Sequence, residues 1–266
     1  RLLLGVDEWG NKTTLLNDEV LTFDRDYTEK KLRVRNDYMR QRIDERNRPD
    51  GRWSSDRKTY FFTESVNLKA GTRSSLRIRL PHLGYTVSMD LNNFLAQYRS
   101  GRMAYLGTFF FQPDAELKPR HRKNRQRAYL GSSMHFARAL LADELTANGF
   151  KVVEAIEDSV TGQEVIVDVD LYSYLKTNPN GTYELTGLAG HEFAVLYYGD
   201  KQFRPLPLKK WRRAQPVQSR FEIETDRCVI LPGGAYGDAG IAFSGYMWTR
   251  GLAWMLPLDY ELRLED

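Results

Sequence analysis

The chain of 266 residues has little cysteine, little histidine and little net charge. Its single cysteine, Cys228, excludes a disulfide framework and every zinc or iron–sulfur site that needs several cysteines. Its four histidines, His82, His121, His135 and His191, lie far apart in the sequence. The formal net charge of +4 is too balanced for nucleic acid to be the default partner, so no nucleic-acid partner is expected. The length is sufficient to bury a core without cross-links or a structural metal.

Long apolar runs are missing as well. None approaches the roughly 18 residues that a membrane helix needs, so no transmembrane segment is expected. The first residues, Arg1-Leu-Leu-Leu-Gly5, are too short for a secretory signal peptide. Because the chain begins with Arg rather than Met, we expect it to be a processed product, a fragment or part of a longer protein.

Arginine and aspartate dominate an early segment, and the stretch 37–57 is predicted to be a charged surface excursion. The Asn47-Arg-Pro-Asp-Gly-Arg52 sequence within it is typical of a loop, because Pro restricts one backbone angle and Asp-Gly accepts a tight turn. A short helix over about 38–45 is the alternative.

Apolar residues recur at every second position between 76 and 91, which is the pattern of strands with one solvated face. Two further strands, at 94–98 and 103–110, are predicted to flank a turn at Ser100-Gly101. The region 74–112 is therefore predicted to be an antiparallel meander.

A helical period replaces this alternation over about 122–148, and Gly149 is a natural C-terminal stop. The apolar residues of this stretch are three or four positions apart and so share one helix face. They are Leu130, Met134, Ala137, Leu141 and Leu145. The pattern predicts one principal amphipathic helix.

Strands are predicted again after this helix. Together the elements indicate a β-dominated α+β fold, with antiparallel sheets or a sandwich around the principal helix. Residues 1–266 are predicted to form a single compact β-rich domain. The later strands are predicted at 151–156, 163–172, 183–185, 192–198, 220–225, 228–231 and 241–249, with a turn at Thr161-Gly162.

Two basic clusters supply the candidate functional residues. The first lies at the start of the predicted helix, where cations oppose the helix dipole, so helix stability does not explain them. The second surrounds a tryptophan, which can stack on nucleobases or lie at a membrane interface. Both are compatible with a solvated surface or with a surface for an anion, lipid headgroups or an acidic partner. The clusters are Lys118, Arg120, Arg122, Lys123, Arg125 and Arg127, with His121 among them, and Lys209, Lys210, Trp211, Arg212 and Arg213.

No catalytic motif is complete. A zinc-peptidase helix needs a second histidine four residues after His191, but position 195 is Val. A serine-hydrolase G-x-S-x-G elbow is absent, and the glycine-rich stretch 232–240 lacks the ending of a phosphate loop. Asp168 and Asp170 are predicted to share a strand face about 7 Å apart, which suits glycosidase acids or calcium but is equally the pattern of a solvated face. We therefore expect no catalytic residue, cofactor or metal.

Several segments resemble one known group of proteins. They are 80–91 (LPHLGYTVSMDL), 127–140 (RAYLGSSMHFARAL) and 244–250 (SGYMWTR). They are similar to the exported Bacteroidota proteins described as carboxypeptidase-like regulatory domain-containing. The resemblance covers most of the chain and implies export to the periplasm, association with the outer membrane, and a preceding β-sandwich domain that this chain does not include. It carries over no catalytic residue, and the charged stretch near 40–57 departs from it.

Three functional hypotheses follow. The first is a non-catalytic accessory or scaffold subunit on the periplasmic side of an outer-membrane complex for β-barrel assembly, secretion or uptake. It implies a hetero-complex with outer-membrane or periplasmic proteins, and the abundant aromatic residues favour it. The second is a glycan- or peptidoglycan-binding module with Trp211, Tyr236 or Trp248 as a stacking platform. The third is a hydrolase that uses Asp168 or Asp170.

Overall fold

The computed structural model describes residues 4–5, 7–46, 48–97, 102–157, 163–223, 225–237 and 241–262, with the backbone alone at 93, 95–97 and 102–106. The turns predicted at Ser100-Gly101 and Thr161-Gly162 lie outside these residues. Strands make up 42% and helices 23%, and the sheets are antiparallel. This confirms the predicted β-dominated α+β class.

The chain forms two compact units, each described here by itself. Unit 1 comprises Arg1–Val20, Ser74–Asp90 and Gly107–Asp266, and unit 2 comprises Leu21–Arg73 and Leu91–Leu106. This differs from the single compact domain predicted from the sequence. The reason is that the residues from 21 to 73 pair chiefly with one another, in a ribbon that the sequence pattern does not reveal.

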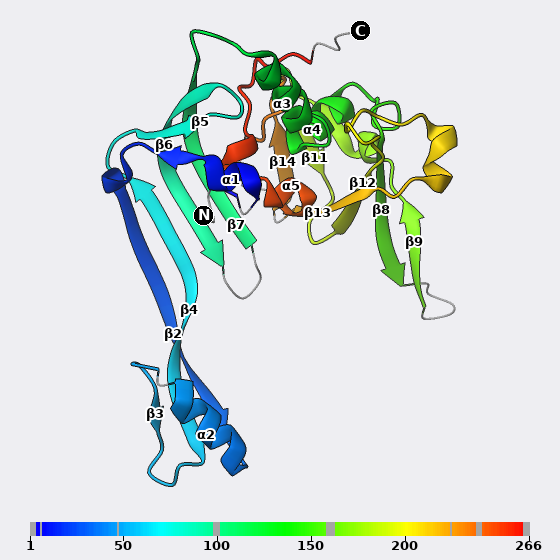
Figure 1. The fold of residues 1–266 in the computed structure, drawn as a ribbon. Coiled ribbons are helices and arrows are strands. Elements are labelled where there is room, and N and C mark those ends of the chain that lie inside the picture. Colours follow the sequence, from blue (N-terminus) through cyan, green and yellow to red (C-terminus); the bar gives the residue numbers. More distant parts are fainter. Residues whose placement is uncertain are drawn as a thin grey trace. The chain divides into compact units, whose positions relative to one another are not determined.

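Unit 2 is built on a long two-stranded ribbon of β2 (Leu21–Arg33) and β4 (Thr59–Thr72), which pair along their whole length. Figure 1 shows α2 (Asp37–Arg46) and β3 (Arg52–Trp53) at one end of this ribbon. The helix corresponds to the alternative considered for 38–45. Charged residues lie on both faces of β2, so its alternation of apolar and polar residues is weak and the strand is not recognisable from the pattern.

The region after unit 2's ribbon is the predicted meander. Strand β5 (Leu76–Leu80) pairs antiparallel with β6 (Tyr85–Gln97), and β7 (Arg102–Pro113) pairs with β6. The strands predicted at 85–91 and 94–98 are thus a single strand. The short β1 (Thr14–Leu15) adds to β5 in unit 1.

The prediction of one principal helix over 122–148 is wrong, because two helices occupy this stretch. They are α3 (Pro119–Tyr129) and α4 (Ser133–Leu141). Gly131 has a φ of +71°, and a Cβ built on it would lie 2.9 Å from the Tyr197 ring, so the chain turns tightly between the helices. Ser132 then caps α4 by accepting a hydrogen bond from the backbone N–H of His135.

Two further antiparallel sheets complete unit 1. The five-stranded sheet has the order β15-β13-β12-β8-β9, and the three-stranded sheet has the order β10-β11-β14. The strands are β8 (Phe150–Glu157), β9 (Glu164–Asp168), β10 (Leu175–Thr177), β11 (Tyr183–Thr186), β12 (Glu192–Tyr197), β13 (Val217–Ile223), β14 (Arg227–Ile230) and β15 (Ile241–Gly245). The short helices are α1 (Glu8–Lys12), α5 (Tyr246–Thr249) and the 3₁₀ segments η1 (Asp18–Val20), η2 (Leu171–Tyr174), η3 (Leu208–Arg213) and η4 (Leu252–Trp254).

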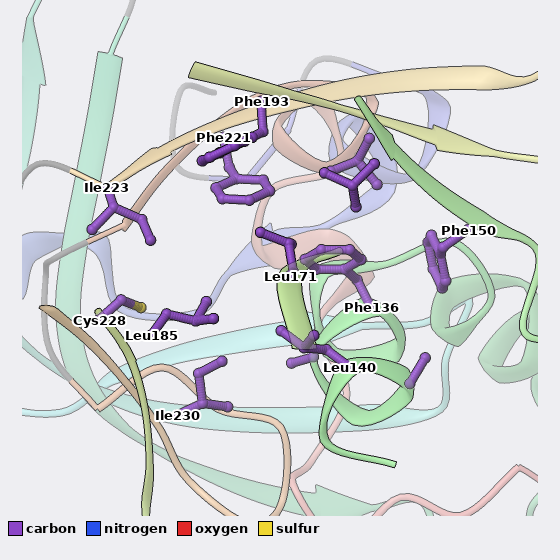
Figure 2. Close-up of a cluster of buried hydrophobic side chains, with 14 of the residues drawn as sticks. Phe136, Leu140, Phe150, Leu171, Leu185, Phe193, Phe221, Ile223, Cys228 and Ile230 are labelled. Atoms are coloured by element: carbon purple, nitrogen blue, oxygen red, sulfur yellow. The ribbon is translucent and has the colours of Figure 1, made fainter. Parts of the chain in front are cut away.

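The core of unit 1 lies between α4 and the two later sheets. Phe136 and Leu140 point from α4 into a cluster that includes Phe150 and Phe221 (Figure 2). The Phe136 ring meets the Phe150 ring edge-on, with centroids 5.4 Å apart. Full burial of each such side chain stabilises the fold by roughly 1.5–3 kcal/mol. Cys228 is buried in the same cluster.

Candidate functional site

The first basic cluster lies on α3, and the fold divides it into outward and inward members. Pro119 occupies the first helical turn, where its missing N–H costs no hydrogen bond, and Lys118 is the N-cap residue. The first turn contains no acidic residue. Lys118, Arg120, Arg122 and Lys123 are exposed, as a solvated or partner-binding face requires.

Arg125 turns inward and joins α3 to the loop between β5 and β6. Its guanidinium donates to the carbonyl oxygens of Leu83 and Gly84 and lies 3.7 Å from the centre of the Tyr85 ring. Partial burial lowers the pKa of Arg125 from its ordinary value. Arg125 is therefore used in packing, and it is not available as part of an open anion surface.

His121, next to this loop, is also a packing residue. It is only 2% exposed, and burial lowers its pKa. Gly84 has a φ of +67°, and a Cβ built on it would lie 2.4 Å from Nδ1 of His121. Glycine at position 84 is thus required by both the turn and the close approach of the imidazole.

Arg127, at the end of the cluster, is exposed, and aromatic rings lie beside its guanidinium. Its guanidinium carbon lies 5.5 Å from the Trp254 ring centre and 5.7 Å from that of Trp9. These two indoles stack with their centres 3.8 Å apart, and the Trp254 indole N–H donates to the Asp7 carboxylate. Cation–π attraction and the stacked indoles explain the position of Arg127 without a bound anion.

Arg250 is a buried cation that the sequence pattern did not single out. It is 4% exposed, and its guanidinium donates to the carbonyl oxygens of Ala128 and Leu130 at the end of α3. It also donates to the Tyr246 hydroxyl and lies 4.4 Å from the Trp254 ring centre. Burial lowers its pKa. Because the C-terminal end of a helix carries partial negative charge, Arg250 acts as a helix cap.

The second basic cluster lies in the 3₁₀ segment η3. Lys209, Lys210, Arg212 and Arg213 are all exposed, whereas Trp211 is half-buried. The Trp211 ring stacks on Tyr198 with centres 4.3 Å apart and an angle of 5°, and its indole N–H donates to the Leu206 carbonyl over 2.8 Å. The tryptophan therefore anchors the segment, and the four cations extend into solvent.

The two clusters do not combine into one surface patch. Both belong to unit 1, but α3 and the gold segment that contains η3 lie apart in Figure 1. Any ligand that used both clusters would have to span the distance between them. Each cluster is therefore considered as a separate candidate surface.

A third candidate surface lies in unit 2 and was not recognised in the sequence. We define the tip as α2, β3 and the adjoining ends of β2 and β4. Trp53 is its organising residue, with its ring edge-on to Tyr60 at 5.0 Å and its indole N–H donating to Asp44 over 2.8 Å. Arg57 lies 4.9 Å from the Trp53 ring centre and pairs with the same Asp44 at 2.6 Å.

Carboxylates hold the tip together through hydrogen bonds. The hydroxyl and the backbone N–H of Thr63 donate to Asp50 and lower its pKa to about 2. The Trp53 indole and Arg57 lower the pKa of Asp44. Both carboxylates are therefore charged at neutral pH and serve as acceptors.

The tip nevertheless leaves large apolar side chains in solvent. Tyr38 is 65% exposed, Met39 is 41% exposed and Leu32 is 40% exposed. Aromatic residues and methionine are enriched at protein interfaces. This signal was masked in the sequence because the arginines and aspartates around these residues dominate the composition of the stretch.

The candidate hydrolase residues have structural partners. The strand predicted at 163–172 ends at Asp168, so the prediction that Asp168 and Asp170 share a strand face is wrong. Asp168 pairs with Lys151 at 2.8 Å, whereas Asp170 caps η2 by accepting from the backbone N–H of Tyr172. The sequence keeps alternating between apolar and polar residues beyond Asp168, but in the structure the 3₁₀ segment η2 begins at Leu171.

The histidines are likewise engaged within the protein. His135 is 2% exposed, accepts from the backbone N–H of Gly131 and is hydrogen-bonded to Asn148. Burial lowers its pKa from 6.5 to about 4. His191 pairs with Glu154 at 2.6 Å on the surface. Across the described ranges, no group of three or more His, Cys, Asp or Glu side chains is arranged to hold a metal ion.

The three aromatic residues proposed to stack on sugars do not present freely exposed rings. Tyr236 packs against the core of unit 1, and its hydroxyl donates to the Ser133 carbonyl. Trp248 is half-buried, and one face of Trp211 is covered by Tyr198. The contacts of these three residues therefore do not favour carbohydrate stacking on them.

Comparison with known proteins assigns neither a family nor a function to the chain. The chain matches no protein-family model, and neither curated proteins nor solved structures include a significant match. Within the part of the chain that the structure describes, no helix combines the length and apolar character needed to cross a membrane. The class of the protein must therefore be argued from its own surfaces.

Proposed function

We propose that the protein is a non-catalytic accessory or scaffold subunit on the periplasmic side of a bacterial outer-membrane complex. The observation that carries the proposal is the tip of unit 2, a folded element that presents Tyr38, Met39 and Leu32 to solvent. A catalytic site would need an enclosed pocket with convergent polar groups. An ordered element with exposed aromatic and thioether groups is suited to protein binding.

The tip is also built to stay ordered without a large core. A two-stranded ribbon alone is marginally stable in water. Here Arg48 lies 4.8 Å from the Phe62 ring centre and Arg52 lies 4.7 Å from that of Phe61, so cations cover the aromatic rings of β4. A preordered surface loses less conformational entropy when a partner binds.

The sequence resemblance supplies the location in this proposal. Export to the periplasm and association with the outer membrane place the tip among envelope proteins. The partner complex would serve β-barrel assembly, secretion or nutrient uptake, and the identity of the bound protein distinguishes these three.

The test is affinity purification of the tagged chain from a Bacteroidota host after mild cross-linking. We expect an outer-membrane protein to copurify in stoichiometric amount. The double substitution Tyr38→Ser and Met39→Ser removes exposed apolar groups and should reduce recovery of that protein at least about tenfold. Tyr172→Ser is the matched control, because Tyr172 is 43% exposed but lies in unit 1.

Recovery of the chain alone, as a monomer without a cross-linked partner, contradicts the proposal. Equal recovery of the partner with the tip variant and the control shows that the tip does not carry the interaction. A circular-dichroism spectrum unchanged by the tip substitutions establishes that the loss reflects binding and not unfolding.

A further inference from the structure

The four cations of η3 have no acidic partner among the described residues, whereas some other exposed cations of unit 1 do. Arg204 pairs with Asp200 at 2.9 Å, and Arg220 pairs with Glu192 at 2.9 Å. Among the residues that the structure describes, no carboxylate pairs with the side chains of η3, which are Lys209, Lys210, Arg212 and Arg213. The segment therefore carries four positive charges that no described carboxylate neutralises.

The geometry of η3 sorts these charges around an apolar stripe. In a 3₁₀ helix the side chains at i and i+3 lie one above the other. Leu208 and Trp211 therefore share one row, and the cations form the two rows beside it. Trp211 lies on Tyr198, whereas Leu208 is 61% exposed one turn earlier. Of the two residues in the apolar row, Trp211 is therefore packed on the protein and Leu208 is exposed to solvent.

We propose that η3 docks on the surface of a membrane that contains anionic lipids. The cations would contact lipid phosphates, and Leu208 would enter the boundary between headgroups and acyl chains. An apolar row flanked by Lys and Arg is the pattern of segments that lie in a membrane interface. Protein interfaces are instead depleted in Lys, and two of these four cations are Lys.

The anchoring of Trp211 determines how the segment would dock. Its indole N–H is already bonded to Leu206 and its ring is stacked on Tyr198, so the tryptophan holds η3 in place. The docking groups are thus Leu208 and the cation rows, presented by a preordered turn. Such contact goes beyond the proposed subunit role and needs no protein partner, so the two proposals fail independently.

The experiment uses the purified chain with vesicles of phosphatidylcholine alone and with vesicles in which one third of the lipid is phosphatidylglycerol. Leu208→Cys places an environment-sensitive dye at the docking point. Cys228 has no exposed surface, so the dye reacts at position 208. We expect a blue shift with anionic vesicles at low salt, its loss at high salt, and quenching by lipids brominated near the headgroup.

Charge removal supplies the control, with sedimentation of the unlabelled chain as the readout. Neutralising η3 by Lys209→Gln, Lys210→Gln, Arg212→Gln and Arg213→Gln should weaken binding to anionic vesicles at least about tenfold. The matched variant neutralises the same number of exposed cations on α3 and should weaken binding much less. Its substitutions are Lys118→Gln, Arg120→Gln, Arg122→Gln and Lys123→Gln.

Three results with the vesicles overturn the proposal. They are absence of binding to anionic vesicles, equal weakening by the two variants, and an unshifted dye in a chain that sediments with the vesicles. Binding of η3 to polyglutamate that is as tight as its binding to vesicles also overturns it, because an acidic polypeptide would then be the ligand. Thermal melting of each variant confirms that it is folded.

Discussion

Neighbouring cations of α3 have different physical roles although the sequence presents them as one cluster. Arg120 and Arg127 are exposed, Arg127 with indole rings beside it, whereas Arg125 is half-buried and donates to two backbone carbonyls next to a tyrosine ring. A guanidinium is suited to such positions because it is planar, stacks on aromatic faces and keeps its charge. At the residue scale, function is therefore expected from the outward cations, and stability from the inward ones.

His135 makes a residue-scale prediction about pH. Burial lowers its folded-state pKa to about 4, against 6.5 for the unfolded chain. The unfolded state therefore binds the proton more readily, so stability is fully present above pH 6.5 and falls as the pH drops towards 4. Urea unfolding at neutral and mildly acidic pH should show a loss of up to about 3 kcal/mol from this group.

His135→Gln is the variant that isolates this contribution. Glutamine can replace a hydrogen bond to Asn148 but does not titrate. We expect the variant to be less stable at neutral pH and to lose less stability on acidification than the original chain. The same loss in both proteins would show that His135 does not cause the acid sensitivity, which would then belong to other groups such as His121, whose pKa burial also lowers.

At the element scale, the ribbon of unit 2 depends on the cluster at its tip. Beyond the residues where β4 pairs with β6, the two strands β2 and β4 pair mainly with each other, with β3 adding one short pairing. A ribbon of this kind gains little from burial, so the contacts of Trp53, Tyr60 and Asp44 are expected to decide whether α2 is folded.

Trp53→Ala tests this dependence. It removes the indole donor to Asp44, the edge contact with Tyr60 and the ring that Arg57 covers. We expect amide hydrogen exchange across 37–46 to accelerate at least about tenfold, while exchange in α4 is unchanged. Retained protection of α2 in the variant would contradict the role assigned to Trp53.

At the scale of the whole molecule, the two compact units predict two unfolding transitions. Cys228 has no exposed surface in the core of unit 1, so its reaction with a thiol reagent reports opening of that core. Amide exchange at the tip reports unit 2. In a urea series, the tip should lose protection at a lower concentration than the one that exposes Cys228. A single midpoint for both probes would show that the units unfold together.

Some features of the protein were determined by the sequence itself. The alternation between 76 and 91 predicted β5 and much of β6, because a strand's two faces are encoded by every second residue. The run of basic residues at 209–213 was visible in the sequence as a candidate exposed surface, and the exposure of its four cations in η3 agrees with that pattern.

Tertiary structure decided the rest, because contacts between distant segments have no local signature. The ring of Tyr197 requires a glycine at position 131, where the predicted helix is interrupted. The carbonyl oxygens at the end of α3 accept hydrogen bonds from Arg250, which lies more than a hundred residues later in the sequence. The ribbon of unit 2 exists because β2 and β4 pair with each other despite charges on both faces of β2. Local periodicity fixes which faces of an element are apolar, but only packing determines which charges are buried and which remain available to a partner.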